Sequence, residues 1–473
     1  FMFETIIDAI NTFLYSKLLI VILIGSGIYF TIRTRFPQVR LFRNACSAVM
    51  EKPEGKESVS SFQALMVSTA SRVGTGNIVG VSSAICIGGV GSVFWMWIIA
   101  ILGSASALAE STLAQIYKKK GKNGECYGGP AYYIEAALHS RGLAVVFCIA
   151  MILTYAFGFN MLASYNLQST FAGQTFYNAD ITPWIIGGIL ALVTGWCLLG
   201  GGNRIVKVTS TLVPFMGIVY ILISLLVVVL NIGQLPSVMA QIFDEAFDFK
   251  AIFAGFAGSA MMQGIRRGLY SNEAGIGSAP NAAASAMVSH PVKQGLVQML
   301  SVFIDTLLLC TATAMMCLVS GVAPVKELQG APWVQAALHK TLGSFGPYFI
   351  MIAMVLFAFT TLLGNCFYCD NLLTYIHKKQ PGKKFMTGFR IVSALAVFLG
   401  AGMEMTLLWH ISDVLMGVMA LINIPVILIL SNTVLKALKD YERQIRQKKN
   451  PVFFSKNIDL KQKTDYWNET TCE

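Results

Sequence analysis

The chain has 473 residues, of which 55% are hydrophobic and only 12% are charged. With a mean hydropathy of +0.63, it has too few charges to cover the surface of a water-soluble globular protein, so we expect a polytopic membrane protein. The net charge of +11 could indicate a nucleic-acid-binding protein. However, the lysines and arginines gather in short segments between apolar runs, which is typical of cytoplasmic loops and argues against nucleic acid as a partner.

The first apolar run spans about 13–32 and is followed by a basic segment. It is long enough to cross a bilayer, and the charges after it place its C-terminal end in the cytoplasm. It lacks the short hydrophobic core, basic start and cleavage site of a signal peptide, so we expect it to remain in the mature protein. The basic residues that follow it are Arg33, Arg35, Arg40, Arg43, Lys52 and Lys56.

Ten further apolar runs follow, and eleven spans put the N-terminus outside and the C-terminus in the cytoplasm. We expect these spans at about 61–91, 92–117, 143–166, 183–199, 208–231, 251–287, 295–319, 346–376, 388–402 and 405–431. Basic residues test this count, because cytoplasmic loops carry an excess of them. The loops 118–122 and 378–384, expected inside, are rich in lysine, whereas 167–182, expected outside, has no basic residue. The sequence therefore predicts a multi-pass protein of the cell (inner) membrane.

A glycine-rich stretch at 72–80 interrupts the second run, and we expect it to break a membrane helix. A shift of 195 positions lays this stretch on 267–275, with five identities over the thirteen positions that begin at Arg72. The same shift lays Glu110 on Asp305, and each is a rare carboxylate within an apolar run. The second match supports the first, because it does not depend on the abundance of small residues.

The two interrupted runs cross the membrane in opposite directions, so the repeat is inverted. Five spans separate the starts of its halves, which predicts an all-α fold with a 5+5 inverted repeat and one additional N-terminal span. Paired, interrupted spans at matching places in inverted halves point to the binding site of a transporter. The expected units are 1–60 for the N-terminal helix and cytoplasmic loop, 61–231 for the first repeat, 251–431 for the second and 432–473 for a basic cytoplasmic tail.

The residues of the first break suit an amino-acid carboxylate. Gly74 and Gly76 let the backbone leave helical geometry at little steric cost. Thr75 adds a hydroxyl group, and Asn77 can bind a ligand or cap the half-helix that follows. Free amide groups and the positive dipole at the start of that half-helix favour an anion. The alternative is that Gly76-x-x-x-Gly80 is a helix-packing face.

In the second copy we expect the break at Gly268 to Asn272. Tyr270 would form an aromatic wall against a small side chain, or pack as ordinary core. Gln263, one or two turns earlier, either reaches the cavity or bonds a neighbouring helix. The residues expected to bind the substrate are Gly74, Thr75, Gly76, Asn77, Gln263, Gly268, Tyr270, Ser271 and Asn272.

Thr360 and Thr361 in the ninth span offer hydroxyl oxygens that can combine with backbone carbonyls near Gly74. Hard oxygen ligands without a cage of carboxylates suit Na⁺ better than Ca²⁺ or Mg²⁺. The alternative is that each hydroxyl bonds a carbonyl of its own helix. Both threonines remain candidates, since either hydroxyl could face inward.

Glu110 and Asp305 lie within spans, where an ionisable group is costly and a functional role is the first hypothesis. Arg72 and Arg267, which the repeat also relates, are the expected partners in a buried charge network. Two roles stay open for this network: a structural ion pair in each half, or a proton relay.

Three stretches carry a resemblance to a known family. They read Ser-Arg-Val-Gly-Thr-Gly-Asn at 71–77, Arg-Gly-Leu-Tyr-Ser-Asn-Glu-Ala-Gly-Ile-Gly-Ser-Ala-Pro at 267–280 and Phe-Ile-Asp-Thr at 303–306. These runs resemble those of the alanine or glycine:cation symporter family, and the similarity covers nearly the whole chain. The resemblance implies a LeuT-like fold and Na⁺-driven uptake of a small neutral amino acid. It assigns Thr75 and Gly76 to the substrate, Tyr270 to the side-chain pocket, and the Thr360/Thr361 segment to sodium.

Two stretches depart from the family pattern. Residues 159–165 read Phe-Asn-Met-Leu-Ala-Ser-Tyr where many relatives read roughly Phe-Asn-x-x-Gln-x-Asn, and Asn365-Cys366 stands where many have Trp-Ser. Both stretches could line the pocket, so the resemblance leaves the exact amino acid open.

The leading interpretation is a secondary symporter that couples inward Na⁺ movement to uptake of an amino acid of the alanine, glycine or serine class. The alternative is a proton-coupled amino-acid transporter that uses Glu110 or Asp305. The sequence contains no Walker A motif and no evident nucleophile with a base, which argues against a primary pump and an enzyme. The expected partners are the amino acid, Na⁺ as coupling ion and the lipid bilayer, with no organic cofactor and no nucleic acid. The oligomeric state is left unassigned.

Overall fold

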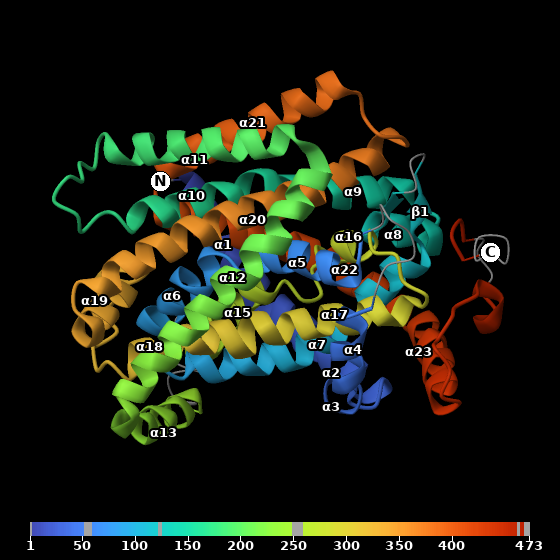
Figure 1. Cartoon of the computed structure of the whole chain (residues 1–473), viewed down its shortest axis with the longest axis horizontal. Helices are drawn as coiled ribbons and strands as arrows, with labels where there is room; N and C mark the ends of the chain where they lie inside the picture. Colours follow the sequence, from blue (N-terminus) through green and yellow to red (C-terminus); the bar gives the residue numbers. More distant parts are fainter. Residues whose placement is uncertain (1, 52–58, 122–124, 248–258, 461–463, 468–473) are drawn as a thin grey trace.

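The computed structural model describes residues 2–51, 59–121, 125–247, 259–460 and 464–467. Long helices run side by side along the longest axis of the molecule (Figure 1). The basic residues Lys52, Lys56 and Lys122 lie outside the described residues, as do 251–258 at the start of the span expected at 251–287.

The first half of the chain holds the N-terminal helix and the first set of spans; η denotes 3₁₀- or π-helical segments. In order, its elements are α1 Met2–Phe13, η1 Leu14–Leu19, α2 Ile20–Arg33, α3 Pro37–Arg40, α4 Phe42–Val49, α5 Ser61–Arg72, η2 Thr75–Asn77, α6 Val79–Gly88, α7 Ser92–Ile116, β1 Lys119–Lys120, β2 Cys126–Tyr127, α8 Pro130–Leu138, α9 Arg141–Ile152, η3 Leu153–Gly158, α10 Phe159–Ser169, α11 Thr182–Leu199, α12 Gly201–Leu230, η4 Ile232–Gln234 and α13 Leu235–Ala246. The two short strands pair antiparallel.

The second half repeats the pattern of long helices and one interrupted helix. Its elements are α15 Ala260–Asn272, α16 Pro280–Ala283, α17 Pro291–Val302, η6 Phe303–Cys310, α18 Thr311–Leu318, η7 Lys326–Leu328, α19 Ala331–Leu342, α20 Phe345–His377, α21 Lys383–Ala401, α22 Met405–Ile429, α23 Ser431–Arg446 and η8 Ser455–Ile458.

Eight helices in the described residues are long and apolar enough to cross a membrane. They coincide with eight expected spans, namely those other than the first and the two interrupted ones. In the first span, the apolar helix α2 is shorter and joins α1 through the π-helical turn η1. The described helices of the two interrupted spans are too short to cross a membrane, because α5 ends at Arg72 and α15 ends at Asn272.

The first helix break lies where the glycine-rich stretch predicts it. A capping box starts α5, because Ser60 Oγ accepts from Gln63 N at 3.1 Å and Gln63 Oε1 accepts from Ser60 N at 3.0 Å. The helix ends at Arg72, and Gly74 is extended, with φ −141° and ψ −156°. Asn77 Oδ1 accepts the amide hydrogen of Gly74 at 2.9 Å, which ties the two sides of the break together.

The second break lies later than expected, so its predicted place at Gly268 to Asn272 is wrong. Helix α15 continues to Asn272, and the chain turns at Glu273, which is left-handed with φ 53°. Gly275 and Gly277 follow with φ of 86° and 87°, values that favour glycine. Gly268 instead serves close helix packing, since a Cβ there would lie 2.6 Å from Ile99 Cγ2 of α7.

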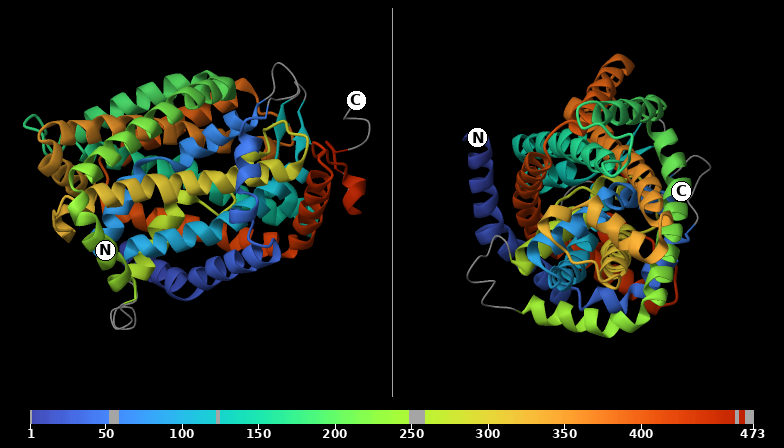
Figure 2. Two further views of the ribbon diagram at one scale, coloured as in Figure 1. Left: turned by 60° about the horizontal axis from the view of Figure 1, so that its bottom comes forward. Right: turned by 90° about the vertical axis from the view of Figure 1, so that its left-hand side faces the viewer.

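Both interrupted helices lie in the interior of the bundle, whereas α1 lies at its periphery (Figure 2). Nearly every residue of α5 and α15 is buried, although both helices carry many polar side chains. Buried polar groups need partners within the protein. The polar residues of these helices must therefore bond one another or a ligand.

The segment expected as a basic tail begins with α23 and folds back on one end of the bundle (Figure 1). Trp467 Nε1 donates to the carbonyl oxygen of Gln115 at 2.7 Å, and only 2% of Trp467 is exposed. Lys118 Nζ lies 3.9 Å from the centroid of the Tyr466 ring, within cation–π distance. The described part of the tail thus covers the end of α7.

Candidate functional site

The first break presents unpaired backbone groups inside the protein. The amides of Thr75 and Gly76 have no hydrogen-bond acceptor within the described part of the chain. Both residues are buried. The Thr75 hydroxyl accepts from Asn166 Nδ2 at 3.1 Å, so α10 faces this site. Two buried donors without acceptors can bind a carboxylate.

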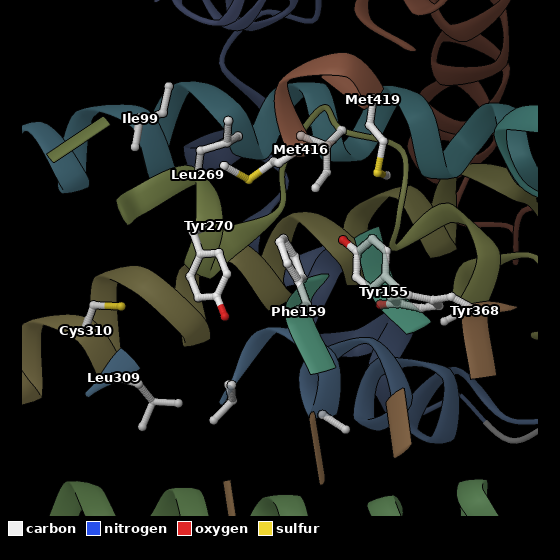
Figure 3. Close-up of a cluster of buried hydrophobic side chains, with 14 of the residues drawn as sticks. Ile99, Tyr155, Phe159, Leu269, Tyr270, Leu309, Cys310, Tyr368, Met416 and Met419 are labelled. Atoms are coloured by element: carbon white, nitrogen blue, oxygen red, sulfur yellow. The ribbon is translucent and has the colours of Figure 1, made fainter. Parts of the chain in front are cut away.

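Tyr270 of α15 lies directly against the first break. A Cβ on Gly76 would lie 2.6 Å from Cε1 of the Tyr270 ring, so no larger residue fits at Gly76 without displacing the ring. The Tyr270 ring packs edge-on against Phe159 and against Trp409, with both centroids at 4.8 Å. Figure 3 shows the rings of Tyr270 and Phe159 side by side. The three rings therefore form an aromatic cluster next to the first break.

Three other residues of the second copy that were expected to bind the substrate make contacts elsewhere in the protein. Gln263 packs against Gly88 at the end of α6, two turns of α15 away from Tyr270. Asn272 Oδ1 accepts from the amide of Ala274 at 3.0 Å and so stabilises the turn that follows α15. With Gly268 packed on α7, Tyr270 and Ser271 are the residues of the second copy that border the first break: the Tyr270 ring lies against Gly76, and Ser271 Oγ accepts from Asn77 Nδ2 at 3.2 Å.

The structure distinguishes between the two threonines of α20. Thr360 Oγ1 donates to the carbonyl of Leu356 at 3.0 Å, one turn back in its own helix. Thr361 Oγ1 is buried and has no hydrogen-bond partner among the described residues. It faces the first break, since a Cβ on Gly74 would collide with this oxygen. An oxygen without a partner at this place suits a cation, and Thr361 is the better candidate ligand.

Asp305 is bound to the first break through hydrogen bonds. It lies in the π-helical segment η6, and such widened turns often occur at functional sites. Its carboxylate accepts from Asn77 Nδ2 at 2.7 Å, Ser271 Oγ at 2.7 Å and Thr306 Oγ1 at 2.8 Å. The side chains of Asn77 and Ser271 are therefore engaged with Asp305.

Glu110 binds the second break in the same way that Asp305 binds the first, through hydrogen bonds to its carboxylate. Its carboxylate accepts from the amides of Gly275 at 3.2 Å and Gly277 at 3.1 Å, and from Asn423 Nδ2 at 2.8 Å. The shift of 195 positions relates Glu110 to Asp305 and also relates the two broken helices. Each carboxylate thus contacts the break in the opposite half of the chain.

Replacing Glu110 by glutamine is expected to lower both thermal stability and uptake. A glutamine keeps one acceptor oxygen but turns an NH₂ group toward groups that are themselves donors. Each lost hydrogen bond to a buried charged group costs about 1.5–3 kcal/mol. Thermal melting of the purified protein measures the loss, with the exposed Glu327→Gln as a control. Equal melting temperatures for Glu110→Gln and this control would contradict a bridging role for Glu110.

The expected ion pair between Arg267 and either of these two acids is wrong. Arg267 instead pairs with Asp413, with Nη2 at 2.9 Å from Oδ2 and Nη1 at 3.3 Å from Oδ1. Its guanidinium carbon lies 3.8 Å from the centroid of the Trp409 ring. This stack lies next to Tyr270, because the Trp409 ring also packs against the Tyr270 ring. The physical reason is helix rotation, which turns Arg267 toward α22.

Arg72 forms no ion pair within 4.0 Å among the described residues. Its Nη1 donates to the side-chain and backbone oxygens of Gln298, at 3.3 and 3.4 Å. The guanidinium interacts electrostatically, at longer range, with Glu110, Glu273 and Asp305. Arg72 is therefore the shared counter-charge of three acids.

Several residues around the site were not expected from the sequence. Asp413 and Glu273, like Glu110, are carboxylates within expected spans. The same reasoning that selected Glu110 could therefore have selected them from the sequence. No sequence signal distinguishes the polar residue Asn166 or the ring of Trp409 from ordinary residues of a span.

Comparison with known proteins gives a consistent picture. Residues 1–455 match the model of the sodium:alanine symporter family. The amino-acid carrier protein AlsT of Bacillus subtilis (strain 168) is 42% identical, over 100% of this chain and 99% of the relative. The probable sodium/glutamine symporter GlnT of the same organism is 43% identical, over 95% of this chain and 93% of the relative.

A solved structure shares the fold. The structure of MhsT in complex with L-phenylalanine matches with a TM-score of 0.60 and 14% identity, over 82% of this chain and 93% of the other. The prediction of an all-helical, LeuT-like membrane fold is therefore confirmed. At this identity the match carries the fold alone.

Proposed function

The chain belongs to the sodium:alanine symporter family, and we propose that it takes up a small neutral amino acid together with Na⁺. It is an amino-acid symporter rather than an enzyme. The substrate carboxylate would bind the amides of Thr75 and Gly76, and its side chain would face Tyr270. Na⁺ would bind between Thr361 and the backbone near Gly74.

The unpartnered hydroxyl oxygen of Thr361 is the observation that carries this proposal. It is buried and lies against the broken backbone at Gly74. Backbone carbonyls released by the break would complete the coordination of an ion. Because Thr361 belongs to α20 and Gly74 to the first broken helix, a bound ion would hold these two elements together.

A large cavity lies at one end of the bundle. It has a volume of about 1190 Å³ and its lining includes Gln63 of α5, Ser210 of α12, Asn281 of α16 and Asn371 of α20. Basic residues near the starts of α12 and α21 also line it, and by the charge rule we infer that this end faces the cytoplasm. A Cβ on Gly364 would lie 2.6 Å from the backbone nitrogen of Ser71, so α5 and α20 are in close contact between the cavity and Thr361.

The proton-coupled alternative through Glu110 or Asp305 is less well supported. Every hydrogen bond to either carboxylate comes from an N–H or O–H donor. Donors stabilise the ionised form of a carboxylate. We therefore propose a structural role for both acids and assign the coupling to Na⁺.

Uptake into proteoliposomes tests the proposed substrate class. We expect alanine, glycine and serine to compete with one another, and lysine and glutamate to compete weakly, because uncharged aromatic rings crowd the first break at Gly76. Uptake should require an inward Na⁺ gradient. Glutamine belongs in the panel, since one relative is named for it. Strong competition by lysine, or full uptake on a proton gradient without Na⁺, would exclude this proposal.

Replacing Tyr270 by alanine is expected to admit larger side chains. The ring lies against Gly76 and between Phe159 and Trp409, so its removal opens space next to the substrate side chain. Competition by leucine or phenylalanine should increase more than glycine uptake declines. Tyr220→Ala is a matched control, because Tyr220 is buried against Phe349 and Phe357. The same change in selectivity in both variants would place Tyr270 outside the pocket.

A further inference from the structure

We propose that Glu273 holds a proton in this conformation and is a proton-binding site of the transporter. Glu273 lies in the second helix break and is 1% exposed. The proposed sodium and substrate sites do not use it. The presence of the proton rests on hydrogen-bond geometry and charge balance, and only its role in transport rests on the proposed function.

A chain of hydrogen bonds fixes the direction of each donor near Glu273. It starts at the carbonyl oxygen of Ala156, which can only accept and lies 3.4 Å from Asn160 Nδ2. Asn160 Oδ1 therefore points the other way and accepts from Asn365 Nδ2 at 2.9 Å. Asn365 Oδ1 in turn faces Ser71, whose Oγ is 2.7 Å away. Since an amide oxygen has no hydrogen, Ser71 must donate to it.

Ser71 has a single hydroxyl hydrogen, so it cannot also serve its second neighbour. Glu273 Oε1 lies 3.2 Å from Ser71 Oγ. With the hydrogen of Ser71 engaged by Asn365, a hydrogen bond at this distance requires a hydrogen from the carboxyl group. Glu273 Oε2 accepts from Ser278 Oγ at 2.7 Å, so Oε1 carries the proton.

The charge balance around Glu273 agrees with a neutral acid. Arg72 is the cation that faces Glu110, Glu273 and Asp305 within the described residues. With all three acids ionised, two buried negative charges would remain uncompensated, and with Glu273 neutral only one remains. Uncompensated charge in a buried environment is costly.

The other titratable groups that face Glu273 add no positive charge. They are the phenols of Tyr155 in η3, Tyr270 in α15 and Tyr368 in α20. Phenols are neutral at physiological pH. The hydroxyl of Tyr155 lies near Glu273 and Ser278, and that of Tyr368 lies near Ser71. Neither hydroxyl makes a hydrogen bond of normal geometry among the described residues, so neither gives Glu273 Oε1 a well-formed donor in this conformation.

The proton is linked to the packing of α5 against α20. Ser71 is in the last turn of α5, and Asn365 lies one turn after Thr361 in α20. When these helices separate, Ser71 loses Asn365 and its hydrogen can turn to Glu273. Glu273 can then release the Oε1 proton to water and remain as a carboxylate that accepts from Ser71. Proton binding would therefore favour the packed arrangement, and packing would favour the proton by the same factor.

Replacing Glu273 by glutamine tests the proposal without a transport assay. Glutamine is neutral, and its amide can donate to Ser71 and accept from Ser278, so Glu273→Gln should melt at the same temperature as the exposed control Glu327→Gln. Infrared spectroscopy of the reconstituted protein at pH 7 should show the C=O stretch of a protonated carboxylic acid in the wild type. This band should disappear in Glu273→Gln and persist in Glu327→Gln.

An unchanged infrared band in Glu273→Gln would overturn the proposal. A Glu273→Gln protein that melts far below the control, or does not fold, would also overturn it, because that result indicates an ionised Glu273 paired with Arg72. The role in transport has a separate test: uptake by the wild type should depend on pH, and this dependence should be weaker in Glu273→Gln. Failure of the sodium or substrate proposal changes neither the band nor the melting result.

Discussion

Replacing Thr361 by valine is expected to raise the Na⁺ concentration for half-maximal uptake about tenfold or more. Valine keeps the volume of threonine and removes the buried oxygen that faces Gly74. An interaction between a polar group and a charge contributes about 1.5–3 kcal/mol, and about 1.4 kcal/mol is a factor of ten in affinity. The amino-acid affinity at saturating Na⁺ should change much less.

Thr360→Val is the matched control for this prediction. Its hydroxyl donates to the carbonyl of Leu356, so its removal should leave the Na⁺ dependence close to that of the wild type. Thr361→Ser restores an oxygen at the site and should restore most of the Na⁺ affinity. Uptake as a function of Na⁺ concentration in proteoliposomes measures all three. If Thr361→Val keeps the wild-type Na⁺ dependence, the sodium site is elsewhere.

Replacing Asp413 by asparagine is expected to destabilise the protein by about 3–5 kcal/mol, because the change leaves Arg267 buried without its counter-charge. The exposed fractions of the Arg267 and Asp413 side chains are 7% and 0%. The expected result is a large fall in melting temperature together with a loss of uptake. The loss follows because the Arg267 guanidinium is stacked on Trp409, which packs against Tyr270.

An exposed ion pair provides the control for Asp413. Lys119 and Asp465 pair at 2.9 Å, but about half of each side chain is exposed. Such pairs contribute about 0–1 kcal/mol, so Asp465→Asn should melt near the wild type. The double variant Arg267→Met/Asp413→Leu should lose less stability than Asp413→Asn, since it removes both charges. A small effect of Asp413→Asn, similar to that of Asp465→Asn, would contradict the importance of this pair.

These two predictions depend on different kinds of information. The sequence located the threonine pair, because two adjacent hydroxyl residues within an apolar span can be recognised from the sequence. It did not select Thr361, because two adjacent residues on a helix differ in direction by about 100°. Helix rotation decides which of them faces the break, and rotation is set by packing against the neighbouring helices.

The sequence by itself determined the membrane class, the positions of the long spans, the first break and the family. Hydropathy suffices for the spans, because the thickness of a bilayer sets the length of an apolar run. The first break could be located because glycines within an apolar run weaken a helix and so favour its interruption. The family resemblance rests on contiguous runs of residues, which need no tertiary structure to compare.

Only the tertiary structure decided the partners of the buried charges and the place of the second break. Arg267 meets Asp413 across 146 residues, and Glu110 meets Gly275 across 165. Such pairings depend on which helices become neighbours, and no local pattern encodes this. The second break lies at Gly275 and Gly277 rather than at Gly268, because these glycines have different neighbours. Gly268 packs against α7, whereas Gly275 donates its amide hydrogen to Glu110. The same residue type therefore permits close packing at one position and a turn at another.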